Sequence, residues 1–304
     1  MAWHCGTIRH HEKSIAWGIL MPIAKASLHG AISIVNAIAT GKGATLGISP
    51  KVETEIETLQ GKGIIIESET KNLSSRLINK VVEKIVPKND LDKTKIRISL
   101  KSEIPTGYGL KSSSAISSAV ALACAKLFNP RLNDSQILVA GVDASIETGV
   151  SITGAYDDAC ACYYGGFVVT DNYKRKIIHS EKGPRNLSVV IFIPKSRKRG
   201  NIRNLKTQSA IFEQAWNLAK NSDYWNAMIL NGLATSTVLN SDPRIIAELV
   251  ERGALGASIS GNGPSIAAVT KKDNITNLKK VFSSFDGETV VAEVNNKKAE
   301  VYEL

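Results

Sequence analysis

Residues 104–115 constrain this chain most, because a loop with two glycines runs there directly into three serines and a helical pattern. Gly107 and Gly109 can adopt backbone angles that other residues avoid. From Ile116 to Leu127, apolar residues recur at spacings of three and four, which predicts a helix. The unpaired N–H groups of its first turn favour an anion such as phosphate. The same pattern also fits a capped core helix after an ordinary turn.

The composition allows a large folded protein with an anionic small-molecule ligand. The 304 residues suffice for one large domain or two lobes with a cleft, and the hydrophobic fraction of 43% supports a core. Every window of eighteen residues contains charged or polar side chains, so we expect no membrane partner. The net charge of +10 fits either an anionic substrate or a solvated basic surface. Scattered lysines and arginines and only 6% aromatic residues argue against a nucleic-acid partner.

The four cysteines predict thiols rather than disulfides. Cys5, Cys124, Cys160 and Cys162 form no CxxC pair, so we expect a reducing, cytoplasmic location. The spacing of Cys160 and Cys162 is a weak signal for a metal site. Small buried residues in a tightly packed segment explain it better.

The first twenty residues do not fit the pattern of the rest. Basic residues precede an apolar run from Ile15 to Ile23, which imitates a secretory signal. Pro22 interrupts that run, and the sequence after Met21 already has the pattern of a domain. We therefore expect residues 1–20 to be an extension and Met21 to be the functional start.

The remaining chain alternates between strand and helix patterns. Residues 51–58 alternate polar and apolar side chains, which predicts a half-exposed strand. A helix is expected at 72–86, and a strand at 95–101 leads to the glycine loop. A strand is expected at 164–170, after which the pattern changes. We place a first lobe at 21–172 and a second lobe at 173–304. Elements expected in the second lobe are strands at 187–193, 266–270 and 288–294 and helices at 205–220, 224–239, 243–252 and 273–285.

Two further loops carry glycines and polar residues. One spans residues 148–159 and contains Asp157 and Asp158, and the other spans Gly256 to Ser265. Two aspartates in a turn are usually solvated caps. With the first loop, however, these are the parts that phosphoryl transfer needs. The Walker signature and the HRD and DFG sets of protein kinases are all absent from the sequence.

The ordered loops resemble a known kinase superfamily. Residues 105–115 are similar to the PxxxGLxSSSA motif of the GHMP small-molecule kinases. Together with residues 36–43, 153–159 and 260–264, they resemble the archaeal-type shikimate kinases. The resemblance runs from about Met21 to the C-terminus. It implies an α+β, two-lobed fold with an N-terminal β/α nucleotide-binding lobe and a C-terminal ferredoxin-like lobe.

The resemblance also implies the reaction and its residues. ATP would phosphorylate the 3-hydroxyl of shikimate, with Mg²⁺ held by Ser113 and Glu147. Asp157 would accept or orient the proton of that hydroxyl. Residues implied to enclose ATP are Pro105, Thr106, Gly107, Tyr108, Gly109, Leu110, Lys111, Ser112, Ser113, Ser114 and Ala115, with Gly261 and Gly263 from the second lobe.

The carboxylate of shikimate needs a fixed cation. Guanidinium groups match carboxylates in a fork geometry. Arg197 and Arg199 are therefore the first candidates, followed by Lys42, and Asp158 is a candidate for the substrate hydroxyls. A solvated basic loop is the competing interpretation of the two arginines.

Other functions of the same fold stay open at this point. Homoserine or an alcohol of the mevalonate pathway are alternative acceptors, although the Asp157 and Asp158 pair argues against homoserine. A protein of this fold that binds a ligand as a sensor, without catalysis, is the alternative that is not an enzyme. We expect a small-molecule substrate and a monomer or homodimer.

Overall fold

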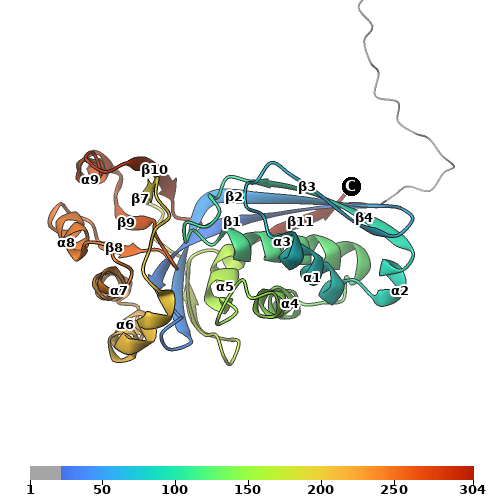
Figure 1. The fold of residues 1–304 in the computed structure, drawn as a ribbon, viewed down its shortest axis with the longest axis horizontal. Helices are drawn as coiled ribbons and strands as arrows, with labels where there is room; N and C mark the ends of the chain where they lie inside the picture. Colours follow the sequence, from blue (N-terminus) through green and yellow to red (C-terminus); the bar gives the residue numbers. More distant parts are fainter. Residues whose placement is uncertain (1–21) are drawn as a thin grey trace, which may run out of the picture.

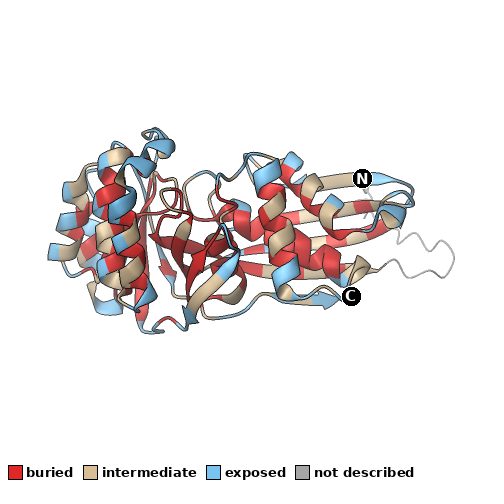
Figure 2. Cartoon of the chain, turned by 90° about the horizontal axis from the view of Figure 1, so that it is seen from below, coloured by how far each residue is buried: buried red, intermediate tan, exposed pale blue. Residues whose placement is uncertain are grey.

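The computed structural model of this protein describes residues 22–304. The expected extension at residues 1–20, and Met21, lie outside the described residues. Two sheets and their helices form two lobes that lie end to end (Figure 1). The buried residues follow the inner faces of the helices and strands in both lobes (Figure 2). None of the helices in residues 22–304 combines the length and apolar character needed to span a bilayer.

The first lobe is built on a seven-stranded sheet. Its strands run in the order β11-β1-β2-β4-β3, while β5 pairs with β2 and β6 with β5. Within residues 22–304, β3 and β4 are the only strands of this sheet that pair in parallel. The strands are β1 (Ile23–Val35), β2 (Lys42–Gln60), β3 (Gly63–Ser68), β4 (Thr94–Ser102), β5 (Phe167–Asp171), β6 (Lys176–Glu181) and β11 (Glu300–Glu303).

Alternation of side chains explains why β2 has one buried face. Val52, Thr54 and Ile56 are buried beneath the helices, whereas Glu53 and Glu55 point to the other side. The half-exposed strand predicted at residues 51–58 is confirmed, as part of a longer strand.

Helices cover one face of this sheet (Figure 1). They are α1 (Ser75–Ile85), α2 (Lys88–Leu91), α3 (Ser112–Phe128), α4 (Asp134–Glu147) and α5 (Tyr156–Tyr164). The central helix α3 is buried along nearly its whole length because its neighbours are α1, α4, α5 and the sheet. Alanine, serine and Cys124 on α3 let these elements approach closely. Packing thus fixes the direction in which the start of α3 points.

The second lobe contains a four-stranded antiparallel sheet in the order β10-β7-β9-β8. Its strands are β7 (Leu187–Pro194), β8 (Gly256–Ile259), β9 (Ile266–Lys271) and β10 (Gly287–Glu293). Its helices are α6 (Ser209–Lys220), α7 (Tyr224–Val238), α8 (Pro243–Glu251) and α9 (Ile275–Val281), with 3₁₀ turns η1 (Ile202–Gln208) and η2 (Lys272–Asn274). Strands and helices follow one another as in a ferredoxin-like fold. The predicted fold class is confirmed.

Two strands that follow the lobe boundary predicted between residues 172 and 173 belong to the sheet of the first lobe. Strand β6 lies after that boundary but pairs with β5 in the first sheet. Strand β11, at the end of the chain, returns to pair with β1. Local patterns predict strands but not the sheet they join, so the sequence could not reveal either pairing.

Two element boundaries also differ from the prediction. The strand expected at residues 164–170 begins at Phe167, because Tyr164 is the last residue of α5. Gly165 and Gly166, both with positive φ, separate the two elements. The helix expected at 273–285 is shorter, since α9 covers only Ile275–Val281.

Candidate active site

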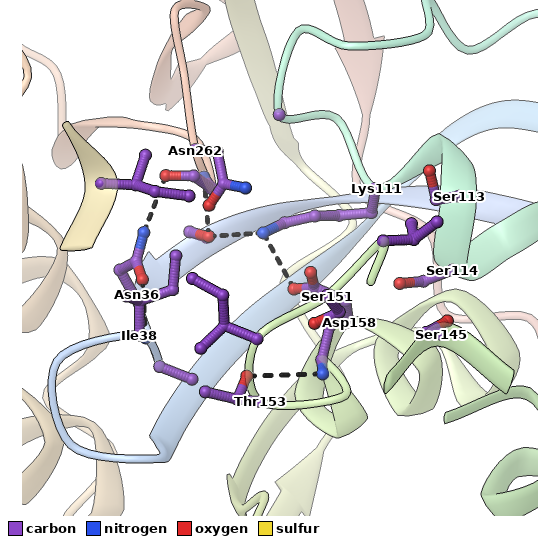
Figure 3. Close-up of a pocket in the computed structure, with 18 of the residues that line it drawn as sticks. Asn36, Ile38, Lys111, Ser113, Ser114, Ser145, Ser151, Thr153, Asp158 and Asn262 are labelled. Carbon is purple, nitrogen blue, oxygen red and sulfur yellow. Dashed lines mark hydrogen bonds and ion pairs between the residues drawn. The ribbon is translucent and has the colours of Figure 1, made fainter. Parts of the chain in front are cut away.

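A pocket of about 500 Å³ lies where the two lobes meet. Figure 3 shows side chains from both lobes around it, with Ser113 and Ser114 on one side and Asn262 on the other. All three predicted loops contribute to its wall. The predicted residues that line it are Gly107, Gly109, Lys111, Ser112, Ser113, Ser114, Asp157, Asp158, Arg199 and Gly261.

The start of α3 forms one wall of the pocket. Gly107 and Gly109 have φ angles of 81° and 82°, which favour glycine, and the helix begins directly afterwards at Ser112. The backbone N–H groups of Ser112, Ser113 and Ser114 have no partner within the helix, because the ladder starts at the fourth residue. Together with the positive end of the helix dipole, they provide an anion-binding site.

Glycine loops from the two lobes touch at the pocket. The Ser260 hydroxyl donates to the Gly109 carbonyl at 2.8 Å, and the Gly261 N–H donates to the Ser33 hydroxyl at 3.0 Å. The Asn36 side chain donates to the Gly261 carbonyl at 2.7 Å. A Cβ on Gly109 would lie 1.9 Å from the Ser260 carbonyl oxygen, so only glycine fits there. These contacts hold the two lobes together at the anion site.

The other predicted residues of the loops support the pocket without lining it. Leu110 and Ala115 are buried in the core, and the Thr106 hydroxyl donates to the Lys71 carbonyl. Pro105 lies on a separate groove. Tyr108 stacks beneath Arg197, with 4.7 Å from the guanidinium carbon to the ring centre. Gly263 offers its carbonyl to Arg199 at 3.1 Å.

Asp157 is buried at the floor of the pocket, with 3% of its surface exposed. One carboxylate oxygen accepts from the Thr45 hydroxyl at 3.0 Å, and the other accepts from the Asn172 side chain at 2.7 Å. The Asp157 backbone N–H in turn donates to Asn172. A Cβ on Gly43 would lie 2.3 Å from the carboxylate. Thr45 and Asn172 were missed in the sequence because nothing nearby marks them.

Asp158 is bound by a buried lysine. The Lys111 ammonium lies 2.8 Å from the Asp158 carboxylate, and the Thr45 hydroxyl lies 3.3 Å from it. Figure 3 shows Lys111 reaching across the pocket to this residue. Burial, with the nearby Asp157 charge adding to it and Lys111 opposing it, raises the pKa of Asp158 to about 7. Thr45 therefore joins two carboxylates in different surroundings.

The family was identified by comparison with known proteins. A family model, "GHMP kinases N terminal domain", matches residues 76–166. A shikimate kinase of Methanosarcina acetivorans is 37% identical over 282 residues, which cover 90% of this chain and 95% of that protein. A shikimate kinase of Pyrococcus furiosus is 33% identical over 267 residues, covering 86% and 95%. The chain belongs to the shikimate kinase family. Its members of this type are GHMP kinases, so the chain is an ATP-dependent small-molecule kinase.

Solved structures agree with this family at the level of the fold. A homoserine kinase from Cytophaga hutchinsonii superposes with a TM-score of 0.73 at 19% identity, covering 95% of this chain and all of that one. The Methanococcus jannaschii mevalonate kinase gives 0.72 at 18% identity, covering 92% and 100%. Such low identities show a shared fold alone.

Of the basic residues predicted to bind the substrate of this shikimate kinase family member, some lie outside the pocket and one lines it. Lys42 lies outside the pocket, where it pairs with Glu213 at 2.5 Å and lies over the Trp216 ring. Arg197 also lies outside the pocket wall. Arg199 lines the pocket, as does Arg203 at the start of η1, which sequence reasoning missed. Arg203 follows the basic loop by four residues, and only the turn of η1 directs it inward.

The predicted metal ligand Glu147 requires a correction. It is the last residue of α4, and its side chain is 49% exposed. Its carboxylate pairs with Lys84 at 2.5 Å and approaches Lys80 at 3.9 Å, away from the pocket lining. Hydrogen bonding to Lys84 lowers the pKa of Glu147. A spacing of ten residues before Asp157 does not fix which way a helix end points, so the structure does not bring Glu147 to Ser113.

The structure describes three of the four cysteines, and all three lie in the core. Cys124, Cys160 and Cys162 are buried and free, in line with the predicted thiols and with the small buried residues predicted at Cys160 and Cys162, whereas Cys5 lies outside the described residues. Burial raises the pKa of the Cys124 thiol to about 12. Within residues 22–304, no group of three or more histidine, cysteine or acidic residues is placed to hold a metal ion.

Proposed function

We propose that this protein transfers the γ-phosphoryl group of ATP to the 3-hydroxyl of shikimate. The observation that carries the proposal is one pocket that both the start of α3 and the buried carboxylate of Asp157 line. An anion site and a fixed proton acceptor are the two ends that such a transfer requires. Membership of the shikimate kinase family supports the choice of acceptor.

The triphosphate of ATP occupies the anion site in this proposal. Its oxygens accept from the backbone N–H groups at residues 112–114, and Gly107 and Gly109 supply the positive φ angles of the loop that leads into α3. Gly261 and Asn262 close the same space from the second lobe. The contacts between the two glycine loops form the site before the nucleotide arrives, so little ordering is needed on binding.

Magnesium fits this site through few protein ligands. The Ser113 hydroxyl is exposed in the pocket beside the anion site. Mg²⁺ prefers oxygen ligands, keeps several waters and commonly takes only one or two groups from the protein. Ser113 and the nucleotide phosphates would therefore hold it. When bound, the ion neutralises charge on the β- and γ-phosphates.

The acceptor occupies the part of the pocket between Asp157 and the second lobe. Its carboxylate pairs with Arg203 and Arg199, whose guanidinium groups suit a bidentate contact. Asp157 accepts the proton of the reacting hydroxyl, and its bonds to Thr45 and Asn172 fix the direction of its carboxylate. Attack of the hydroxyl oxygen forms the new P–O bond as the bond to the ADP oxygen breaks.

A coupled assay of ADP release tests the proposal. Purified protein, ATP and magnesium are mixed with shikimate, homoserine or mevalonate in parallel. We expect release with shikimate only, and mass spectrometry of the product should show one added phosphoryl group. ADP release with only homoserine or only mevalonate would show that the protein is a kinase with a different acceptor. ATP binding without release for any acceptor would favour a ligand sensor.

A further inference from the structure

Lys111 occupies an uncommon place for a lysine. It is the residue directly before α3, and its backbone is left-handed, with φ 65° and ψ 21°. Non-glycine residues adopt this conformation infrequently, and it occurs often at functional sites. The side chain turns inward and is almost entirely buried, with 8% of the residue exposed. Burying an ammonium group is costly unless it is paired, so its partners show what the position is for.

The Lys111 ammonium joins the three parts of the pocket. It donates to the Ser33 hydroxyl at 2.7 Å, where β1 approaches the second lobe, and to Asp158 on α5 at 2.8 Å. A Cβ on Gly261 would come within 2.9 Å of its nitrogen, so the glycine loop of the second lobe packs directly on it. The ammonium thus lies between the start of α3 and the acidic pair.

This is the region that a phosphoryl group must cross from nucleotide to acceptor. Three basic side chains line the pocket, namely Lys111, Arg199 and Arg203. The two arginines are exposed and come from the second lobe, after β7. Lys111 alone is buried and adjacent to the phosphate-binding turn. A protein cation beside this turn can balance phosphate charge together with the Mg²⁺ that Ser113 would hold.

We infer that Lys111 is a catalytic residue that exchanges Asp158 for an oxygen of the γ-phosphoryl group when ATP binds. The inference rests on the proposed function. In the transfer, the acceptor oxygen bonds to phosphorus, the bond to the ADP oxygen breaks, and the hydroxyl proton goes to Asp157. Lys111 keeps its proton throughout and stabilises charge on the moving group. Ser33 keeps the ammonium in place while its other partner changes.

Nucleotide binding separates this role from a structural one. Calorimetry with magnesium compares ADP with a non-hydrolysable ATP analogue for wild type, Lys111→Met and Lys111→Gln. Lys126→Met is the control, because this exposed lysine lies in the last turn of the same helix. We expect Lys111→Met to lose about ten- to a hundredfold of analogue affinity, with ADP affinity nearly unchanged. We expect kcat to fall about a hundredfold or more.

Each other outcome decides the question. The inference would be overturned if Lys111→Met kept the wild-type preference for the analogue over ADP. It would also be overturned if Lys111→Met lost affinity equally for both nucleotides, because that result indicates a purely structural role for Lys111. Lys111→Gln keeps an N–H donor for Asp158 and replaces Lys111→Met if the latter does not fold. Wild-type protein that binds neither nucleotide would contradict the proposed function itself, before any variant is considered.

Discussion

Replacing Gly109 by alanine tests whether the contact between the two glycine loops builds the nucleotide site. A residue with a Cβ at φ 82° costs about 1–2 kcal/mol in backbone strain. The new Cβ would also lie 1.9 Å from the Ser260 carbonyl oxygen, so the loops must move apart. Such overpacking costs about 1–3 kcal/mol. Loss of the Ser260 hydrogen bond to Gly109 adds about 1 kcal/mol. Together these terms predict that Gly109→Ala lowers the free energy of unfolding by about 3–6 kcal/mol.

Gly61→Ala is the matched control. Gly61 also has a positive φ, 106°, but nothing lies within 4 Å of its added Cβ. This variant therefore shows the backbone strain alone. We expect urea unfolding to give Gly109→Ala the larger loss of stability by about 2 kcal/mol or more. Calorimetry should give about tenfold weaker ATP binding only for Gly109→Ala. Equal stability losses, or wild-type ATP affinity in Gly109→Ala, would refute the reasoning.

Three further predictions concern the acidic pair and the arginines. Asp157→Asn should lower kcat about 10²- to 10⁴-fold while ATP affinity stays nearly constant, and steady-state turnover near that of wild type would remove its assigned role. The pKa of Asp158, raised to about 7 from an ordinary value near 4, means that the folded state holds a proton that the unfolded state releases. The free energy of unfolding should therefore fall as pH rises from about 4 to 7, by up to about 1.4 kcal/mol per pH unit. Urea unfolding of Asp158→Asn should not show this decrease. Parallel curves of unfolding free energy against pH for wild type and Asp158→Asn would contradict the prediction. Arg203→Met should raise the KM for shikimate about ten- to a hundredfold with kcat little changed, whereas Arg197→Ala should leave this KM unaltered, and the reverse pattern would reassign the carboxylate site.

Sequence alone determined the local chemistry of this protein. Glycines followed by serines and a helical pattern predict an anion site because backbone freedom and helix starts depend on neighbouring residues only. The resemblance of four ordered segments, these loops among them, indicated a kinase of the GHMP type. The half-exposed strand in β2 was also within reach, because periodicity reports burial.

The tertiary structure decided which residues meet. Asn172 lies fifteen residues after Asp157 and Thr45 more than a hundred before it, yet both bind its carboxylate. Glu147 looked suitable by spacing, but the end of α4 turns it to Lys84. The direction of a side chain depends on elements packed from far along the chain. For that reason Lys111, readable only as part of a loop motif, acquires its buried partners and its inferred role from the fold alone.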